Sequence, residues 1–531
     1  MTNPHFDILR RPLRLARSAA FTLALVAAGV GVAAGPSAWA QHREHAAPAA
    51  APHAANAPSE RANAPAERKL PADTTTDQTV ELPGHTIHFR ATAGSIPLNN
   101  AESGALLAEV AYVAYVVPGD APRPVTFVFN GGPGAASAYL DIGAIGPWRL
   151  PLAHFSISEP PKLVPNAETW LDFTDLVFID PPGTGYSRIA NGDDGRKHFW
   201  SVDGDADALA VFIRKWIEQT GRQQSLKFIA GESYGGFRAP KIAHKLREQG
   251  VGIRGLVMIS PVIDFANLGV SHHMPMGWVH HLPSMAAAAL DDKGQYSREA
   301  VREVERYAAG DYLLDLLKGE RDAAAVARMS TRVAAFTGLD PALVKKLAGR
   351  IDTATFQREL HRAQGLIGSS YDPNVTAYDP DPTSRMTHYS DPVLDGTRAP
   401  ITTAMTDLYQ RVLNWRVDRP YELLNGQVGR DWFRGNGLRR PQVVDDLRDD
   451  LAADARLRVL VAHGANDLVT PYFADELLLR QLPIYGSADR VKLAVYAGGH
   501  MFYDRDESRR ALHADAAALV AAASKAAANG E

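Results

Sequence analysis

A serine between glycines is the first feature of this 531-residue sequence that could do chemistry. Residues 226–230 form an apolar, strand-like run, and GESYG at 231–235 then matches the pattern G-x-S-x-G. In that pattern a strand turns sharply into a helix, glycines let the backbone pass close by, and the serine hydroxyl stands exposed. Residues 238–248 continue with the apolar spacing of a helix. We therefore interpret Ser233 as a nucleophile, with a chance match as the alternative.

A catalytic serine needs a general base, and the base needs a carboxylate that orients it. In hydrolases with G-x-S-x-G the order along the chain is serine, then Asp or Glu, then His. Asp467 follows the strand-like residues 458–462, and His500 follows the strand-like residues 491–496. Because the carboxyl ends of parallel strands meet at one edge of a sheet, we expect both side chains near the serine. His463 is the competing base, but it precedes Asp467 and would reverse the order.

The sequence FVFNGGPG at residues 127–134 is a second chemical motif, a strand-like run that enters a glycine-rich turn. Backbone N–H groups can meet the oxyanion of a tetrahedral intermediate only where no side chain blocks the approach, and glycines leave it open. A phosphate-binding loop is the alternative, but the Lys-Ser/Thr ending of such a loop is missing. We therefore interpret this turn as an oxyanion hole.

The elements that would position these residues alternate in the manner of an α/β protein. The predicted strands are residues 86–90, 109–117, 125–129, 175–179, 226–230, 255–260, 458–462 and 491–496. With helices between the later strands, this pattern predicts a mostly parallel central sheet with helices on both faces. Between residues 265 and 440 helical periodicity dominates. We predict one core in two parts, residues 81–264 and 441–531, interrupted by a mainly helical cap insertion at 265–440.

Residues 1–40 have the features of a signal peptide. Four arginines precede the apolar run 19–34, and AWA at 38–40 is a small-x-small cleavage site. We expect cleavage after residue 40 and export to the periplasm or the medium. An uncleaved anchor is the alternative, but the run is short for a membrane span, so no integral span is expected after cleavage. Residues 41–80, rich in Ala and Pro, are predicted to be a disordered linker.

Charge and cysteine content exclude several classes of function. The chain has 56 Lys and Arg against 60 Asp and Glu, which gives no electrostatic case for a nucleic-acid partner. It has no cysteine, so disulfides and a cysteine nucleophile are excluded. The histidines of the linker lack metal-ligand spacing, and we predict neither a metal nor a cofactor. A peptide or small molecule is the expected partner.

Five blocks of sequence occur in a fixed order: NGGPG at 130–134, DPPGTGYS at 180–187, GESYGG at 231–236, G-x-x-D at 464–467 and GHM at 499–501. In this order they resemble the serine carboxypeptidase family, peptidase family S10. The likeness covers roughly residues 80 to 525. It implies an α/β-hydrolase fold and an exported serine carboxypeptidase that hydrolyses C-terminal peptide bonds through an acyl-enzyme, usually best at acidic pH.

The same resemblance assigns roles to individual residues. Ser233 is then the nucleophile, His500 the base and Asp467 its orienting carboxylate. The other implied residues are the oxyanion-hole donors Gly132 and Tyr234 and the carboxylate-binding residues Asn130, Gly131 and Glu232.

Elementary electrostatics agrees with a carboxylate-binding role for Glu232. Two carboxyl groups at close range cannot both stay ionised, so Glu232 facing a substrate carboxylate must share a proton with it. That requirement explains an acidic optimum. A turn residue with its side chain in solvent is the alternative.

Two residues that are usual in the family are replaced here. Val128 stands in place of a Trp two residues before Asn130, and Ala144 stands in place of a Glu two residues before a Gly-Pro pair. The family's usual disulfides are missing as well. The carboxylate-binding network is therefore thinner, which leaves two alternatives: an esterase or acyltransferase on the same scaffold, and a catalytically silent binding protein.

Overall fold

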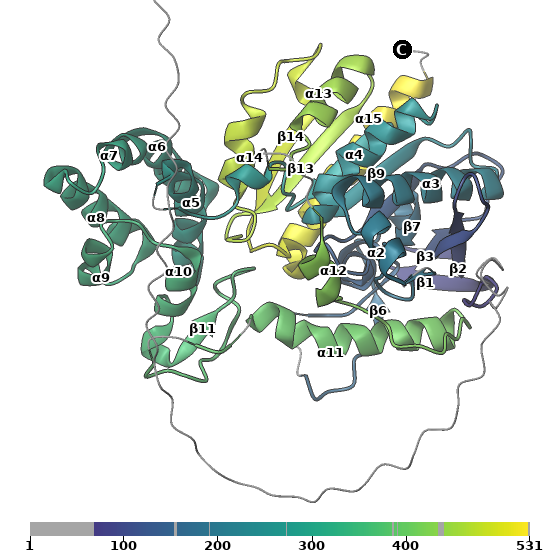
Figure 1. Ribbon diagram of the computed structural model, residues 1–531, viewed down its shortest axis with the longest axis horizontal. Coiled ribbons are helices and arrows are strands. Elements are labelled where there is room, and N and C mark those ends of the chain that lie inside the picture. Colours follow the sequence, from purple (N-terminus) through teal and green to yellow (C-terminus); the bar gives the residue numbers. More distant parts are fainter. Residues whose placement is uncertain are drawn as a thin grey trace, which may run out of the picture. The chain divides into compact units, whose positions relative to one another are not determined.

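The computed structural model describes residues 68–528 except 153–156, 191, 272, 385–386, 390 and 434–439. The described residues belong to one compact unit (Figure 1). The predicted signal peptide and the first part of the predicted linker, residues 1–67, lie outside the described residues. Within the described part of the chain, no helix has the length and apolar character needed to cross a membrane.

A mixed sheet forms the centre of the fold (Figure 1). Its strands are β1 (Thr74–Leu82), β2 (His85–Asn99), β3 (Leu106–Val116), β4 (Val125–Phe129), β7 (Asp175–Ile179), β8 (Arg188–Ile189), β9 (Lys227–Glu232), β10 (Gly255–Ile259), β13 (Arg458–Gly464) and β14 (Val491–Tyr496). Their order is β1-β2-β3-β7-β4-β9-β10-β13-β14, with β8 paired to β3. All pairs from β7 to β14 are parallel, while β1, β2, β3 and β7 pair antiparallel. The α/β-hydrolase sheet expected from the sequence is therefore confirmed.

Helices cover both faces of this sheet, which is why its central strands are continuous apolar runs. In β4, Val128 belongs to one hydrophobic cluster, and its neighbours Phe127 and Phe129 belong to the opposite one. The second cluster includes apolar residues of α3 (Val202–Thr220), α4 (Tyr234–Glu248) and α13 (Val444–Ala453). The first includes apolar residues of α11 (Pro392–Asp407) and α15 (Asp506–Ala528).

Local sequence signals explain where α3 begins and ends. The Ser201 hydroxyl accepts a hydrogen bond from the backbone N–H of Gly204, which caps the first turn. Gly221 follows the last turn at φ +67°, the left-handed conformation that glycine adopts most readily. These two signals set the limits of the helix at Val202 and Thr220.

Most of the residues between β10 and β13 are helical, as predicted for the cap. A third hydrophobic cluster lies here and on the adjoining α14 (Tyr472–Leu479). Its helices include α5 (Pro275–Asp292), α6 (Arg298–Tyr307), α8 (Ala323–Thr337), α9 (Pro341–Lys346) and α10 (Thr353–Glu359). Helix α11, by contrast, packs in the first cluster with the sheet. The segment 265–440 is thus divided between two hydrophobic clusters.

The predicted linker ends too late in the sequence. We expected disorder up to residue 80, but β1 pairs with β2 from Thr74 onward, and Leu70 is already buried. The cause is the alternation of β1, in which Val80 and Leu82 are buried between exposed residues. A threonine-rich segment with this alternation is suited to an edge strand. Its polar composition resembles that of a linker, which is why the strand was not predicted.

Candidate active site

Ser233 lies at the turn between β9 and α4, where the motif predicted it. Its backbone has φ +60° and ψ −121°, a conformation that a side-chain-bearing residue holds only when its surroundings enforce it. A Cβ at Gly235 would lie 2.6 Å from the carbonyl oxygen of Phe129, and a Cβ at Gly231 would overlap the backbone of Gly235. The flanking glycines are therefore required by close packing of the turn.

The structure brings Asp467 and His500 together from the ends of β13 and β14. Asp467 Oδ2 lies 2.7 Å from His500 Nδ1, and both residues are buried. Asp467 Oδ1 accepts hydrogen bonds from the backbone N–H groups of Val469 (2.8 Å) and Thr470 (3.0 Å). The Thr470 hydroxyl also donates to Oδ2 at 2.7 Å. Donors other than the imidazole therefore hold both oxygens of the Asp467 carboxylate in place.

The contacts with Asp467 shift the pKa of His500. Burial by itself lowers the pKa of the imidazole, but the charge and hydrogen bond of Asp467 raise it, and the net shift of the pKa is upward. Tyr371 lies edge-on to the imidazole, with 5.0 Å between ring centroids, and its carbonyl accepts the His500 backbone N–H at 2.6 Å. No hydrogen bond between Ser233 Oγ and His500 is present in the described structure. Such bonds often tighten only when substrate binds.

The competing base pairs with a different carboxylate. His463 is buried, and its Nε2 lies 3.0 Å from Asp475 Oδ2 on α14. This pairing keeps His463 out of the Asp467 site. His500, and not His463, is therefore the histidine that contacts Asp467.

The glycine-rich turn after β4 lies directly against the serine turn. A Cβ at Gly131 would lie 2.6 Å from the carbonyl oxygen of Glu232 and 2.8 Å from the backbone nitrogen of Gly235. Gly132 has φ +98°, which favours glycine. Among the described residues, none accepts a hydrogen bond from the backbone N–H of Gly132 or Tyr234. Both groups are free to donate to an oxyanion, and Tyr234 adds the positive end of the α4 dipole.

Asn130 and Glu232 form a buried pair beside the serine. Asn130 Nδ2 donates to Glu232 Oε2 at 2.5 Å, and Asn130 Oδ1 accepts the backbone N–H of Leu140 at 3.0 Å. The Arg238 guanidinium donates to the Asn130 carbonyl at 2.5 Å and to Asp205 at 2.7 Å. Arg238, which sequence reasoning missed, therefore holds the turn that contains Asn130 in place from α4.

The environment of Glu232 favours its protonated form. Its side chain is buried at 2 % exposure, and this burial is the main reason that its pKa rises to about 7. The charge of His500 and the hydrogen bonds from Tyr503 and Asn130 lower the pKa, and the charge of Asp467 raises it. The alternative of a solvent-exposed turn residue is wrong, because Glu232 faces the interior.

Tyr503 is a second residue that sequence reasoning missed. It lies in η8 (Phe502–Asp504), and its hydroxyl donates to Glu232 Oε2 at 2.8 Å. A Cβ at Gly143 would lie 3.5 Å from the Tyr503 ring, so the ring packs against the segment that contains Ala144. Val128 is buried in the first cluster. The only sequence signal for Tyr503 was its position three residues after His500.

A pocket of about 470 Å³ opens beside these residues. Gly499 and Met501, which flank His500, and Asp504, which follows Tyr503, belong to its lining. Its other walls include Tyr371, Val375, Pro392 and Val393. The charged side chains in its lining are Asp372, Asp504 and Arg505, so the pocket combines apolar walls with a charged region, and it adjoins the candidate carboxylate-binding residues.

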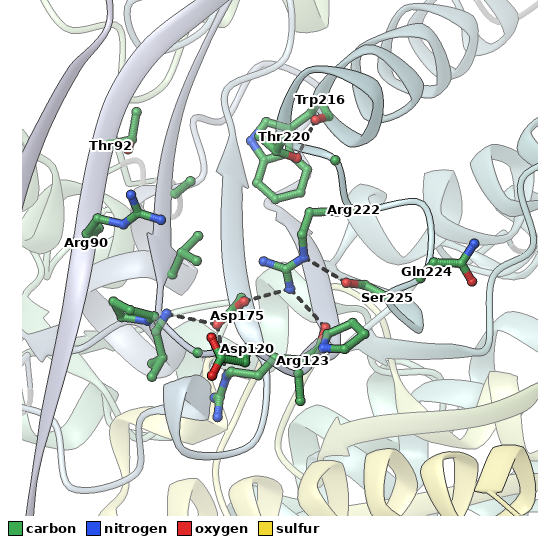
Figure 2. Close-up of a pocket in the computed structure, with 18 of the residues that line it drawn as sticks. Arg90, Thr92, Asp120, Arg123, Asp175, Trp216, Thr220, Arg222, Gln224 and Ser225 are labelled. Atoms are coloured by element: carbon green, nitrogen blue, oxygen red, sulfur yellow. Dashed lines mark hydrogen bonds and ion pairs between the residues drawn. The ribbon is translucent and has the colours of Figure 1, made fainter.

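Figure 2 shows another pocket, of about 580 Å³, at the opposite ends of the parallel strands. Arg222 and Arg123 both contact Asp175 there, at 2.7 and 3.1 Å (Figure 2). Arg222 also donates to Ser225 at 2.7 Å. These contacts connect the start of β7 with the segments that precede β4 and β9, and they place the arginines in structural roles. In the described residues, no group of three His, Asp or Glu side chains could hold a metal ion.

Comparisons with known proteins point to one family. Residues 90–310 match the family model described as serine carboxypeptidase. The chain is 22% identical to the pheromone-processing carboxypeptidase KEX1 of Yarrowia lipolytica over 397 residues, which cover 73% of this chain and 57% of that protein. It is 35% identical to KEX1 of Pyricularia oryzae over 122 residues, or 23% of this chain and 18% of that protein.

Two further comparisons concern a plant protein and a solved structure. Serine carboxypeptidase-like 45 of Arabidopsis thaliana is 27% identical over 204 residues, which cover 36% of this chain and 40% of that protein. The crystal structure of KEX1(delta)p, a prohormone-processing carboxypeptidase from Saccharomyces cerevisiae, has a TM-score of 0.53 and 16% identity, and the match covers 82% of this chain and 91% of that one. At this identity the match concerns the fold. The chain spans little more than half of the first curated relative and less of the others.

Proposed function

The chain belongs to the serine carboxypeptidase family, and from this premise we propose that it is a carboxypeptidase that removes C-terminal residues from peptides. The observation that carries the proposal is the buried pair of Asn130 and Glu232 beside Ser233. A protonated Glu232, with its pKa raised to about 7 by burial, can donate a hydrogen bond to a substrate carboxylate.

The proposed reaction uses five residues. Ser233 Oγ attacks the scissile carbonyl carbon while His500 Nε2 accepts its proton, and Asp467 stabilises the imidazolium. The N–H groups of Gly132 and Tyr234 bind the tetrahedral oxyanion. His500 then protonates the leaving amine, which departs as the free C-terminal amino acid. Water, activated by the same imidazole, hydrolyses the acyl-enzyme and restores the serine.

An esterase or acyltransferase is the second candidate. It is favoured by Val128 and Ala144, which replace two polar or aromatic residues usual in the family. The distinction concerns whether Glu232 binds a substrate carboxylate or only supports the turn. A test must therefore compare substrates that differ at the C-terminus alone.

The test is hydrolysis of a blocked dipeptide with a free C-terminus, its C-terminal amide and a simple ester. We expect the free acid to be preferred at acidic pH and its KM to rise as the pH passes through about 7, because Glu232 then loses the shared proton. Glu232→Gln should flatten that pH dependence, since a neutral amide donates a hydrogen bond at any pH. The amide and ester should change little. Equal effects of Glu232→Gln on all three substrates would favour the esterase.

We also propose that the chain is exported, to the periplasm or the medium. The support is the arginine-rich, apolar and small-residue pattern of residues 1–40. The N-terminal sequence of the protein recovered outside the cytoplasm tests this, and a chain that still begins at residue 1 there would contradict cleavage.

A further inference from the structure

The two oxygens of Glu232 have different surroundings. Oε2 accepts hydrogen bonds from Asn130 Nδ2 at 2.5 Å and from the Tyr503 hydroxyl at 2.8 Å. None of the described residues donates a hydrogen bond to Oε1. A carboxyl oxygen has two lone pairs, and two donors use both of those on Oε2. When Glu232 is protonated, the proton must therefore lie on Oε1.

Tyr503 is held rigidly in the orientation that this arrangement needs. Its side chain is buried, its ring lies 6.0 Å from that of Phe502 between centroids, and its carbonyl accepts a hydrogen bond from Arg509 at 3.1 Å. Burial and the nearby charge of Glu232 raise the pKa of the Tyr503 phenol well above its ordinary value of 10. The hydroxyl therefore remains a donor throughout the working range of pH.

We propose that Tyr503 is a positioning residue for substrate specificity: together with Asn130 it occupies Oε2 of Glu232 and directs the carboxyl proton to Oε1, the oxygen left for the substrate's terminal carboxylate. The inference rests on the proposed carboxypeptidase function. It explains how a site with Ala144 in place of the usual glutamate can still present an oriented proton.

Every charged group near Glu232 bears on its titration. His500 favours the ionised form, and Asp467 opposes it. Asp504 and Glu232 repel each other, and burial, followed by the charge of Glu232, raises the pKa of Asp504 to about 7. The phenol of Tyr139 lies close enough to sense the charge of Glu232. Against this background, the Tyr503 hydrogen bond stabilises ionised Glu232, so its removal must raise the pKa of Glu232.

Tyr503→Phe removes the hydroxyl and keeps the ring. We expect the pH at which KM for the free-acid dipeptide rises to move upward by roughly one unit, since a hydrogen bond to a charged group contributes this much. In the acidic plateau KM should increase roughly fivefold, because the proton is no longer confined to Oε1. The KM values of the C-terminal amide and of the ester should change less than that of the free acid, because neither brings a carboxylate to Oε1. A merely structural role would affect all three substrates alike.

Two further variants sharpen the test. Asp504→Asn removes a negative charge beside Glu232, so the KM transition should move downward, opposite to Tyr503→Phe. Tyr312→Phe is the matched control, because it also removes a buried phenol hydrogen bond, 2.8 Å to the Gly349 carbonyl in the third cluster. We expect its KM profile to match the wild type. An unchanged profile in Tyr503→Phe, or a shift of the same size in Tyr312→Phe, would overturn the inference.

Binding provides a readout that does not depend on turnover. Calorimetry with an N-acetylated amino acid and its amide should be performed on Ser233→Ala, with and without Tyr503→Phe, from about pH 5 to about pH 8. We expect Tyr503→Phe to weaken binding of the free acid about fivefold and to leave binding of the amide unchanged. Free-acid binding without peptide hydrolysis by the wild type contradicts the proposed function only. Equal binding with and without Tyr503→Phe contradicts the role of Tyr503 only.

Discussion

At the scale of single residues, the contacts of Asp467 show how hydrogen bonds would fix the tautomer of the proposed base, His500. Its Oδ1 accepts two backbone N–H groups, at 2.8 and 3.0 Å, and its Oδ2 faces His500 Nδ1 at 2.7 Å. An asparagine there would keep its carbonyl oxygen on the backbone donors and turn its NH₂ group toward the imidazole. That group donates, so Nδ1 of His500 would have to accept and Nε2 would carry the proton. The base would then be in the wrong tautomer.

We therefore predict that Asp467→Asn lowers kcat by a factor of about 10⁴ on peptide and ester substrates alike. The control is Asp475→Asn, which alters the other buried His–Asp pair, 3.0 Å from His463, without touching the triad. Its kcat should stay within a few-fold of the wild type. Steady-state kinetics on proteins with matching circular dichroism provide the comparison. Similar losses in both variants would show that Asp467 acts only on the fold.

The same scale shows which site residues a sequence can reveal. The positions of Ser233, Asp467 and His500 at strand ends were predictable, because each follows a strand-like run in the order expected for G-x-S-x-G hydrolases. Tyr503 and Arg238 were not, because each acts on a partner that is remote in the chain. Tyr503 lies 271 residues from Glu232, and Arg238 lies 108 residues from the Asn130 carbonyl that it holds. Only the folded sheet brings such residues together.

At the scale of elements, one ion pair connects helix α5 to the chain segment that follows His500, the proposed base. Asp291 on α5 accepts two hydrogen bonds from Arg505, at 3.0 and 2.7 Å. It also accepts from Asn374 at 2.9 Å and from Asn466, the neighbour of Asp467, at 2.8 Å. Burial by itself raises the pKa of Asp291. The contacts with Arg505 and these amides lower the pKa by more than burial raises it, so the net shift is downward. Its stabilising contribution is therefore present above the ordinary pKa of Asp and is lost as the pH falls below it.

We predict that Asp291→Asn lowers the free energy of unfolding by about 1–2 kcal/mol at pH 7, a value reduced for its partial exposure. Urea denaturation at pH 7 measures this loss. The control is Asp407→Asn, whose ion pair with Arg411 is exposed on α11 and should contribute little. Limited proteolysis should also cut the region of the third cluster faster in Asp291→Asn. Equal stabilities of the two variants would show that the ion pair between Asp291 and Arg505 does not stabilise the fold.

Element boundaries show where sequence patterns succeed and where they fail. Strands β4 and β7 begin and end where predicted, because both are short apolar runs between turn residues. Strand β1 was missed, since its six residues before Val80 are polar. Helix α11 was assigned to the cap, because its periodicity predicts a helix but not the cluster against which it packs.

At the scale of the whole molecule, buried carboxyl groups link the proposed function to the stability of the fold. Burial is the main cause that raises the pKa of Glu232 to about 7, of Asp504 to about 7 and of Asp180 to about 6. In the unfolded chain these groups ionise at lower pH. Between the two values the folded protein binds more protons than the unfolded chain, so stability falls as the pH rises. The fold and the proposed carboxylate binding therefore both favour mildly acidic pH.

We predict that the free energy of unfolding decreases between about pH 5 and about pH 7.5, and that Glu232→Gln makes this decrease smaller. For Glu232 the pKa rises from 4.5 to about 7, which corresponds to a loss of up to about 3 kcal/mol across that range. A glutamine does not titrate, so the variant should be more stable than the wild type at pH 7.5 and similar to it at pH 5. Urea denaturation at both pH values measures the difference. Glu218→Gln, an exposed change on α3, controls for removal of a charge. A wild-type stability that rises from pH 5 to pH 7.5, with Glu232→Gln following the same course, would mean that Glu232 is ionised in the folded protein and cannot share a proton with a substrate.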